Sequence, residues 1–350
     1  MLRRDFLGVI ACASLASSRL SAAPTSPPPV LLAAAADAQG PLFTAMNGTL
    51  LRTPTRGHGM LPLPGNRELI LMARRPGYWM WRIDWSNGQC LATTEAAPDR
   101  HFFGHAVLAP DGRTILTTEN DLSTGRGLIG LYDSQTLQRL SEWSSHGIGP
   151  HELLWLIPGK VLAVANGGIL TLPETGRLKL NLDRMEPSIV LLEMPSGRLL
   201  AEHVLPDRTL SLRHLARSAD GSLGIAIQAE SPDGTPVTDA PLLAILRENR
   251  LTLADAPAGP GGYGASIAAL GDDFFVTALQ GDTVVQWSSD GRLVREIGLR
   301  RPAGLATRSD HVLVSNELGT IARIDPDSGT LKVELEHPGL RWDNHLATAS

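Results

Sequence analysis

One histidine-led segment recurs along the chain and constrains the fold more than any other feature. Its clearest copy runs from Gly104 to Gly112, where Gly-His is followed by a short apolar run and an Asp-Gly turn. Degraded copies begin at His58, His151, His214, positions 262–264, positions 301–303 and His345. Their spacing of roughly 40 to 60 residues is typical of propeller blades, which bury their apolar faces only by stacking on one another. The sequence therefore predicts a ring of stacked blades.

Turn signals divide each repeat into short strands. Asn-Gly and Asp-Gly pairs separate apolar runs at 87–88, 111–112, 220–221 and 290–291. Gly and Asn readily adopt the positive φ of tight hairpins. In the copy led by His105 we expect strands at 106–109, 114–118, 128–133 and 137–143, whereas residues 178–187 and 231–239 are expected to lie outside the strands. No long stretch shows helical periodicity with caps, so we expect an all-β protein.

The two ends of the chain complete one further blade. Residues 30–36, 41–46 and 49–53 supply three strands without an inner one, and residues 345–350 supply an inner strand without partners. Joining them ties the termini together and removes open sheet edges. We therefore predict one domain over residues 30–350, a seven-bladed β-propeller of the WD40 or YVTN kind.

The first residues carry an export signal. Arg3-Arg4 precede Phe6-Leu7, an apolar run and small residues, a pattern that predicts a twin-arginine signal peptide over 1–22 and a linker over 23–29. The predicted location is the periplasm. The apolar run before Cys12 is too short for us to expect a lipid anchor there, and the run as a whole is too short for a membrane span.

Charge and cysteine content exclude some classes of partner. The net charge is −5 and no basic cluster follows the first residues, so we expect no nucleic-acid partner. Cleavage of the predicted signal peptide would remove Cys12, and the remaining Cys90 alone cannot form an internal disulfide. We expect a monomer with no membrane span.

The histidines occupy the one place where all blades meet. The innermost strand of each blade lines the central channel, so the five histidines at 58, 105, 151, 214 and 345 are expected to converge there. Neutral imidazoles are ligands for iron, copper, zinc and nickel. The supporting residues that we predict are His101 from a rim loop, Glu152, and the polar set at the ends of the second strands, namely Glu119, Asn120, Asp121, Asn166, Gln228 and Asn316. Glu119 and Glu152 are expected either to orient the histidines or to serve as direct oxygen ligands.

Other roles for the histidines remain open. A Gly-His pair before the first strand is also common in WD-type propellers, where hydrogen bonds of the histidine stabilise its own blade. The third strand here ends in Tyr132-Asp133, without the Trp-Asp pair of those repeats. The histidines therefore bind a metal, a haem or an anion, stabilise the blades, or relay protons.

Several long motifs resemble a family of exported proteins known by a domain of unknown function. They are His101-Phe-Phe-Gly-His105, Thr118-Glu-Asn-Asp121, Gly147-Ile-Gly-Pro-His151-Glu152 and Trp342-Asp-Asn-His345. Members of that family occur beside imelysin-like and di-haem oxidoreductase-like proteins, so the resemblance implies a link to iron acquisition, with iron or haem as the ligand. Periplasmic iron-uptake proteins are the implied partners.

The sequence thus favours a periplasmic protein that binds a metal, with iron ahead of copper, or serves as an accessory protein in iron uptake. Two alternatives stand beside it. One is a metal-dependent enzyme, either a hydrolase or an oxidoreductase, built on the propeller axis. The other is a protein-interaction scaffold whose histidines are structural.

Overall fold

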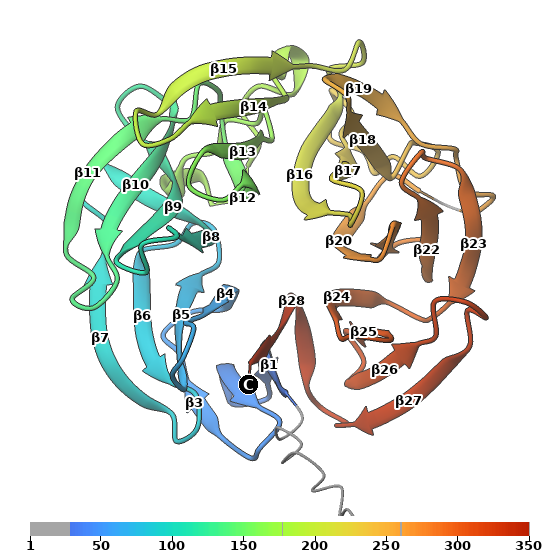
Figure 1. Cartoon of the computed structure of the whole chain (residues 1–350), viewed down its shortest axis with the longest axis horizontal. Coiled ribbons are helices and arrows are strands. Elements are labelled where there is room, and N and C mark those ends of the chain that lie inside the picture. The colour runs from blue at the N-terminus through green and yellow to red at the C-terminus, as the bar shows by residue number, and fades with distance from the viewer. Residues whose placement is uncertain (1–28, 177, 260, 350) are drawn as a thin grey trace, which may run out of the picture.

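The computed structural model describes residues 29–176, 178–259 and 261–349. Within these ranges the chain forms 28 strands, β1 to β28, and two short 3-10 helices, η1 and η2. The strands are arranged as blades around a central axis (Figure 1). The predicted signal peptide and Cys12 lie outside the described residues. Among the described residues, no helix is long and apolar enough to cross a membrane.

Each blade is a four-stranded antiparallel sheet that runs from the axis outward. The innermost strands are β4 (Gly57–Pro62), β8 (Arg100–Leu108), β12 (Pro150–Ile157), β16 (Leu210–Arg217), β20 (Gly264–Leu270), β24 (Pro302–Thr307) and β28 (Arg341–Ala349). The second strands are β5 (Glu68–Ala73), β9 (Thr114–Asp121), β13 (Val161–Asn166), β17 (Leu223–Ala229), β21 (Asp273–Ala278), β25 (Val312–Asn316) and β1 (Val30–Asp37).

The two outer positions of each blade follow in the same order. The third strands are β6 (Trp79–Asp84), β10 (Gly127–Asp133), β14 (Ser188–Glu193), β18 (Leu243–Arg247), β22 (Thr283–Ser288), β26 (Thr320–Ile324) and β2 (Gly40–Ala45). The outermost strands are β7 (Gln89–Glu95), β11 (Arg139–Ser144), β15 (Arg198–His203), β19 (Arg250–Leu253), β23 (Leu293–Gly298), β27 (Leu331–Glu336) and β3 (Leu50–Arg52).

The seventh blade joins the two ends of the chain, as predicted. Strand β28 pairs antiparallel with β1, and β2 and β3 complete the sheet in the order β28-β1-β2-β3. Figure 1 shows β28 and β1 side by side next to the C-terminus. A single parallel contact between Leu305 and His345 links this blade to its neighbour. The seven-bladed β-propeller expected from the repeat is confirmed.

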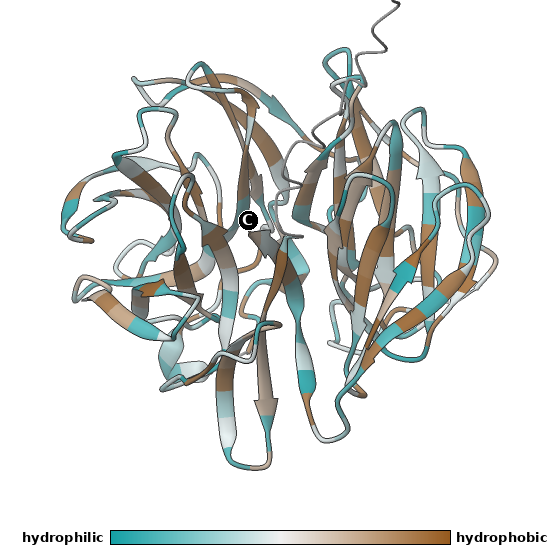
Figure 2. Cartoon of the chain, turned by 60° about the horizontal axis from the view of Figure 1, so that its bottom comes forward, coloured by the Kyte–Doolittle hydropathy of each residue, from teal (hydrophilic) through white to brown (hydrophobic). Residues whose placement is uncertain are grey.

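The apolar core is divided among the interfaces between neighbouring blades. Ile245 packs with Phe274 and Trp287 of the next blade. At the closing interface Leu42 of β2 packs with Leu313 of β25. There are seven such clusters of buried residues in the described chain, one for each pair of adjacent blades. Figure 2 shows that the hydrophobic segments lie largely in the strands. Because each blade is buried against two others, closing the ring is required to complete the core.

A β-bulge interrupts the innermost strand of every blade. Pairing with the second strand skips residues between Gly57 and Met60, Phe102 and Ala106, Pro150 and Glu152, Leu212 and Leu215, Gly264 and Ile267, Pro302 and Leu305, and Trp342 and Leu346. All five repeat histidines lie within these skipped segments. A bulge turns a side chain away from the direction that the pleat would give it. The bulges therefore place the five histidines where the innermost strands line the axis of the ring.

The bulges correct the predicted starting points of two repeats. The residues that immediately precede the resumed pairing are Ser266 in β20 and Gly304 in β24. Four of the other blades have their histidine at this position, and the blade of His58 has Gly59 there. A Cβ atom on Gly304 would lie 2.9 Å from the backbone carbon of His345. The close approach of β28 therefore leaves no room for a side chain there.

Strand boundaries in the blade led by His105 also differ from the prediction; for example, β9 ends at Asp121 rather than at 118. Strand β8 begins at Arg100 rather than at 106, because Arg100 to Phe102 pair with the end of β9 across the bulge. Strand β11 begins at Arg139 rather than at 137, since Leu137 occupies a left-handed turn with φ of 57°. Residues 178–187 lie outside the strands as expected, next to η1 (Pro173–Thr175) and around η2 (Leu182–Arg184).

Candidate metal centre

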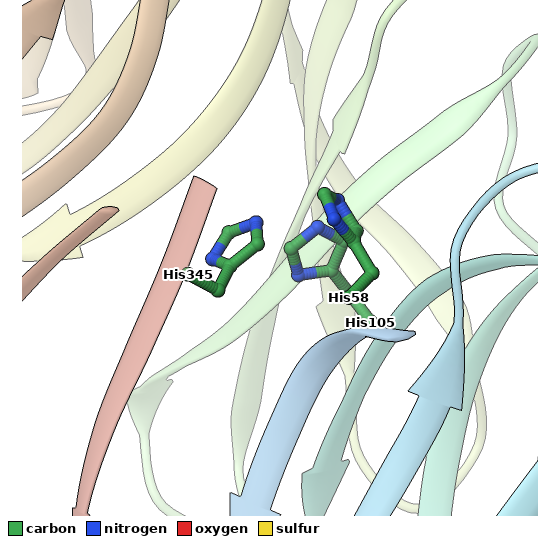
Figure 3. A group of neighbouring side chains, drawn as sticks. All are labelled: His58, His105 and His345. Atoms are coloured by element: carbon green, nitrogen blue, oxygen red, sulfur yellow. The ribbon is translucent and has the colours of Figure 1, made fainter. Parts of the chain in front are cut away.

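Five histidine side chains from five blades meet on the axis of the propeller. The ring centroids of His58 and His345 are 4.3 Å apart, and those of His151 and His214 are 4.5 Å apart. His105 lies between the two pairs, 4.7 Å from His345 and 5.3 Å from both His151 and His214. Figure 3 shows the rings of His58, His105 and His345 gathered beside one another. The convergence predicted from the repeat is therefore present.

The cluster contains two overlapping sets of possible metal ligands. In the set His58, His105 and His345, one nitrogen of each ring lies within 4.8 Å of the others, and the same holds for His105, His151 and His214. His105 belongs to both sets. Four of the rings are buried, with exposed fractions of 4% to 9%, and His345 is partly buried. An ion held here would be shielded from bulk water.

Glu152 links two of the histidines through their Nδ1 atoms. One of its carboxylate oxygens lies 3.1 Å from Nδ1 of His214, and the other lies 3.6 Å from Nδ1 of His105. The backbone N–H of Leu215 donates to the same carboxylate at 2.9 Å. A carboxylate that accepts the Nδ1 proton of a histidine fixes the ring and leaves Nε2 as the ligand atom. Glu152 therefore acts as a supporting residue.

Asp343 plays the equivalent part for His58. Its Oδ1 accepts from Nδ1 of His58 at 2.7 Å, across the junction of the first and last blades. Its Oδ2 pairs with Arg56 at 2.7 Å and with Arg74 at 3.0 Å. Burial opposes the ionised form, but Arg74 and the hydrogen-bonded His58 outweigh it, so the pKa of Asp343 is held well below its usual range. Asp343 is thus an ionised, fully buried anchor for His58.

The Nε2 atoms are left with few partners. Among the described residues, Nε2 of His105 and Nε2 of His345 are buried without a hydrogen-bond partner. Nε2 of His151 lies 3.3 Å from Nε2 of His214. Buried polar atoms are normally satisfied, because desolvation without a partner costs about 1–3 kcal/mol each. Unpartnered nitrogens that face a common space are suited to a ligand.

All five imidazoles are neutral in this environment. Burial lowers the pKa of each histidine, and it lowers that of His105 to about 3. Burial also raises the pKa of Glu152. A neutral imidazole is the form that binds a metal ion. The cluster therefore needs no deprotonation at neutral pH before it can coordinate a cation.

Most of the predicted second polar set lies apart from the cluster and supports the backbone. Glu119 pairs with Arg139 at 2.8 Å and accepts from Tyr132 at 2.8 Å, both on its own blade. A Cβ on Gly130 would overlap this carboxylate, so the glycine makes room for it. Asp121 caps the turn at Ser123 and Thr124. The side-chain amide of Asn120 donates to the backbone carbonyl of Thr171, and that of Asn166 donates to the backbone carbonyl of Ser145. The side-chain oxygen of Asn316 accepts from the backbone N–H of Thr320.

Of the two remaining predicted residues, Gln228 lies beside the cluster as expected, whereas His101 does not lie where it was expected. His101 is inside β8 rather than in a rim loop, and it is completely buried with its ring 4.9 Å from that of Phe103. It belongs to neither set of ligand candidates. Gln228, at the end of β17, lines a cavity beside His151 and His214. The bulge in β8, which the sequence pattern does not reveal, accounts for the position of His101.

The sequence interpretation missed the residues that anchor and surround the cluster. Asp343, Arg56, Arg74 and Arg213 were not predicted as site residues. Asp343 precedes His345 by two residues, within a motif that was already conspicuous for its Trp-Asp-Asn-His order. Only the pairing of β28 with β1 places its carboxylate against His58 of the following blade. Long-range pairing of this kind has no local sequence signal.

The histidines separate two cavities of about 190 Å³ each. One is lined by Met60, Met72, Glu152 and residues that follow the histidines along the innermost strands. The other contains four basic side chains and lies towards the starts of these strands. His214 lines both cavities. The cluster is therefore reached from two sides that differ in chemistry.

Comparisons with known proteins support the fold and give a family. The profile of a family described as "Protein of unknown function (DUF1513)" matches residues 51–349. No curated protein matches the sequence. Among solved structures, the WD40 repeats of RRP9 superpose with a TM-score of 0.59 at 13% identity, covering 83% of this chain and 82% of that one. Hydrazine synthase of Kuenenia stuttgartiensis gives 0.60 at 13% identity, with 85% and 90% covered.

Proposed function

The chain belongs to the DUF1513 family of proteins of unknown function, and we propose that it is an exported protein that binds a transition-metal ion at its axial histidines. The observation that carries the proposal is the orientation of the rings. The carboxylates of Asp343 and Glu152 accept from Nδ1 of His58 and His214, and Glu152 also lies 3.6 Å from Nδ1 of His105, which leaves Nε2 as the ligand atom of these rings. Carboxylate–histidine pairs of this kind orient the ligands of metal ions.

The charge of Glu152 adds a second argument. Its described partners are two neutral imidazoles and one backbone N–H, so its negative charge has no described cationic partner. A buried charge without a counter-charge is costly, whereas a bound divalent cation would neutralise it. The site is therefore better suited to a cation than to an empty state.

The donors narrow the identity of the ion. Imidazole nitrogens suit iron, copper, zinc and nickel, and they suit magnesium or calcium poorly. The ring centroids are only 4.3 to 5.3 Å apart between neighbours, which leaves room for an ion but not for a porphyrin between them. We favour iron because the family resemblance points to iron acquisition, with the protein acting in the periplasm as a binding or accessory component.

The hydrogen-bond partners of the histidines argue against the WD-type role. His58 bonds to a residue of the last blade, and His214 bonds to a residue of the preceding blade. The described side-chain bonds of these two histidines therefore do not hold their own blades together. They bring imidazoles from different blades to one point.

Metal analysis of protein purified from its native periplasm without an affinity tag tests the proposal. We expect near-stoichiometric iron, or another transition metal, in the wild type and its loss in the folded His105→Ala/His151→Ala variant. Circular dichroism and thermal melts establish that the variant is folded. A wild type that contains no metal and shows no thermal shift with iron, copper or zinc would make the histidines structural and would overturn the proposal.

A further inference from the structure

The cavity on one side of the histidines has an unusual lining. It measures about 190 Å³, and its lining includes Arg74, Arg75, Lys179, Arg213, Gln228 and Tyr263 together with three of the axial histidines. We call it the basic cavity. Four of these side chains are cationic, and none of the described lining residues carries a carboxylate. The remaining polar groups are imidazoles, amides and a phenol, which can donate hydrogen bonds.

The nearby carboxylates do not balance these cations. Asp343 is shared between Arg56 and Arg74. Glu230 is shared between Lys179 and Arg213. Three cations of the lining, Arg74, Lys179 and Arg213, thus share two carboxylates, and one of these carboxylates also pairs with Arg56 outside the lining. The excess of positive charge around a small, partly closed space focuses the potential on an anion.

Arg213 is the most informative of the cationic residues. It is 7% exposed, and its guanidinium contacts Glu230 at 3.4 Å and Ser211 at 3.1 Å. Guanidinium groups bind carboxylates and phosphates through paired N–H donors. A buried arginine in the wall of a cavity without acidic residues is suited to such an anion.

The insertion after β13 completes the wall. Lys179 lies between η1 and η2 and reaches Glu230, which follows β17 of the next blade. The insertion is held in turn by Asn181, which donates to Gly168 at 2.9 Å. The Lys179 side chain is 29% exposed, so it lies where the cavity approaches solvent. The insertion therefore adds a cation to the site rather than only lengthening the blade.

We propose that the basic cavity binds a small multivalent oxyanion, such as phosphate or a short polycarboxylate, directly beside the axial histidines. The cavity of about 190 Å³ has room for an anion of this size. His58, His151 and His214 form part of the wall. An oxygen of the anion can therefore reach a metal ion held by these rings; this last step rests on the proposed metal-binding function.

Anion binding is tested first on the metal-free full-length mature protein. Isothermal titration at low ionic strength with inorganic phosphate and, separately, with citrate distinguishes the two sources of the same chemistry. We expect saturable binding of at least one of them with a stoichiometry near one. Acetate serves as the monovalent comparison and is expected to bind at least about tenfold more weakly, since it offers fewer acceptors for the cations. No saturable binding of either multivalent anion would overturn the proposal.

Gln228→Glu is the decisive variant, because it changes the charge of the cavity without removing a buried arginine. It should reduce anion binding by about tenfold or more. Gln89→Glu, on the exposed β7, makes the same chemical change away from the cavity and should leave binding unchanged. Lys179→Gln supplies a second test in a partly exposed position. Equal binding by wild type and both cavity variants would contradict the assignment.

A final arm separates this inference from the metal proposal. If both sites exist and touch, the anion should tighten metal binding, and the metal should tighten anion binding by the same factor, typically 5-fold to 150-fold. Anion binding in protein that takes up no metal would support the basic cavity and refute the metal centre. Metal binding without anion binding would support the metal centre and refute the anion site in the basic cavity.

Discussion

Two glutamates, one buried and one partly exposed, show how residues predicted for the same role can differ. Glu119 and Glu152 were both predicted to support the histidines or to serve as direct oxygen ligands. Glu119 is inside a blade, where Arg139 and Tyr132 hold its carboxylate at 2.8 Å. Glu152 is at the axis, where its described partners are two imidazoles and a backbone N–H.

The difference lies in how each charge is compensated. The charge of Glu119 is neutralised by an arginine of its own sheet, so it stabilises the blade with or without a ligand. The charge of Glu152 is opposed by burial, which raises its pKa, and it meets neutral rings. An ion bound by those rings would complete its environment. Buried charges that lack a counter-charge are therefore the better guide to a binding site in this protein.

Low pH should have the largest effect on the free energy of unfolding. We expect this effect to come from the axial histidines rather than from the outer parts of the blades. The folded metal-free protein keeps His105 neutral down to a pKa of about 3, whereas an unfolded histidine takes up a proton near pH 6.5. The unfolded state then binds more protons, so stability is fully present above pH 6.5 and falls as the pH drops towards 3. We expect a loss of about 1.4 kcal/mol per pH unit for each such histidine.

Urea unfolding of metal-free protein between pH 7 and pH 4 measures this slope. The His105→Asn variant should show a shallower dependence by up to one proton. Equal slopes for the two proteins would mean that His105 is charged in the folded state, which would contradict the neutral form assigned to its ring.

Loss of His105 should have the next largest effect, because it belongs to both ligand sets. We expect His105→Ala to weaken metal binding by more than about 100-fold, beyond the 10-fold to 100-fold typical of an orienting partner. Competition with a chromogenic chelator measures the affinity. His203→Ala, on the outer strand β15, is the matched control and should bind as the wild type does. An effect of the same size in both variants would remove the distinction between axial and peripheral histidines.

Replacing each of the two glutamates by glutamine tests their different roles directly. Glu152→Gln should weaken metal binding by about 10-fold to 100-fold, because it removes the acceptor that orients His105 and His214. It should leave the stability of the metal-free protein nearly unchanged. Glu119→Gln should do the opposite and lower the free energy of unfolding by about 1–3 kcal/mol, since Arg139 loses its ionic partner. Chelator competition measures the metal affinity of both variants, and urea unfolding measures their stability. Weaker metal binding in the Glu119 variant, with a loss of stability in the Glu152 variant, would refute the roles given to the two glutamates.

The smallest expected effect comes from one of the two blades that contribute no histidine. Gly304→Ala should destabilise the protein by about 1 kcal/mol or somewhat more, because the new methyl group meets the backbone of His345 at 2.9 to 3.0 Å. Gly298→Ala is the control, since a Cβ there has no heavy atom within 4 Å. Thermal melts compare them. Equal melting temperatures would mean that β24 and β28 are not as close as described.

The fold was predictable because its signals are local. Turn residues mark the hairpins, and the spacing of the histidine-led segments gives the blades; even the closing blade follows from an unmatched inner strand at His345. The site was predictable in its histidines, which repeat with the blades, and in Glu152 and Gln228, which lie beside them. The bulges depend on pairing between strands, and they decide that His101 lies within β8 and that Gly304 replaces a histidine. Likewise, Asp343 meets His58 only after the ring closes.

Anomalous diffraction from crystals of the natively loaded protein, recorded on both sides of the absorption edge of the metal, would locate the ion itself. We expect a peak on the propeller axis about 2.0–2.2 Å from Nε2 of His105 and from nitrogens of at least two other axial histidines. The Glu152 carboxylate should remain on the Nδ1 side of the rings. A map with no peak among these histidines, from protein shown to contain the metal, would place the ion elsewhere and refute the axial metal centre.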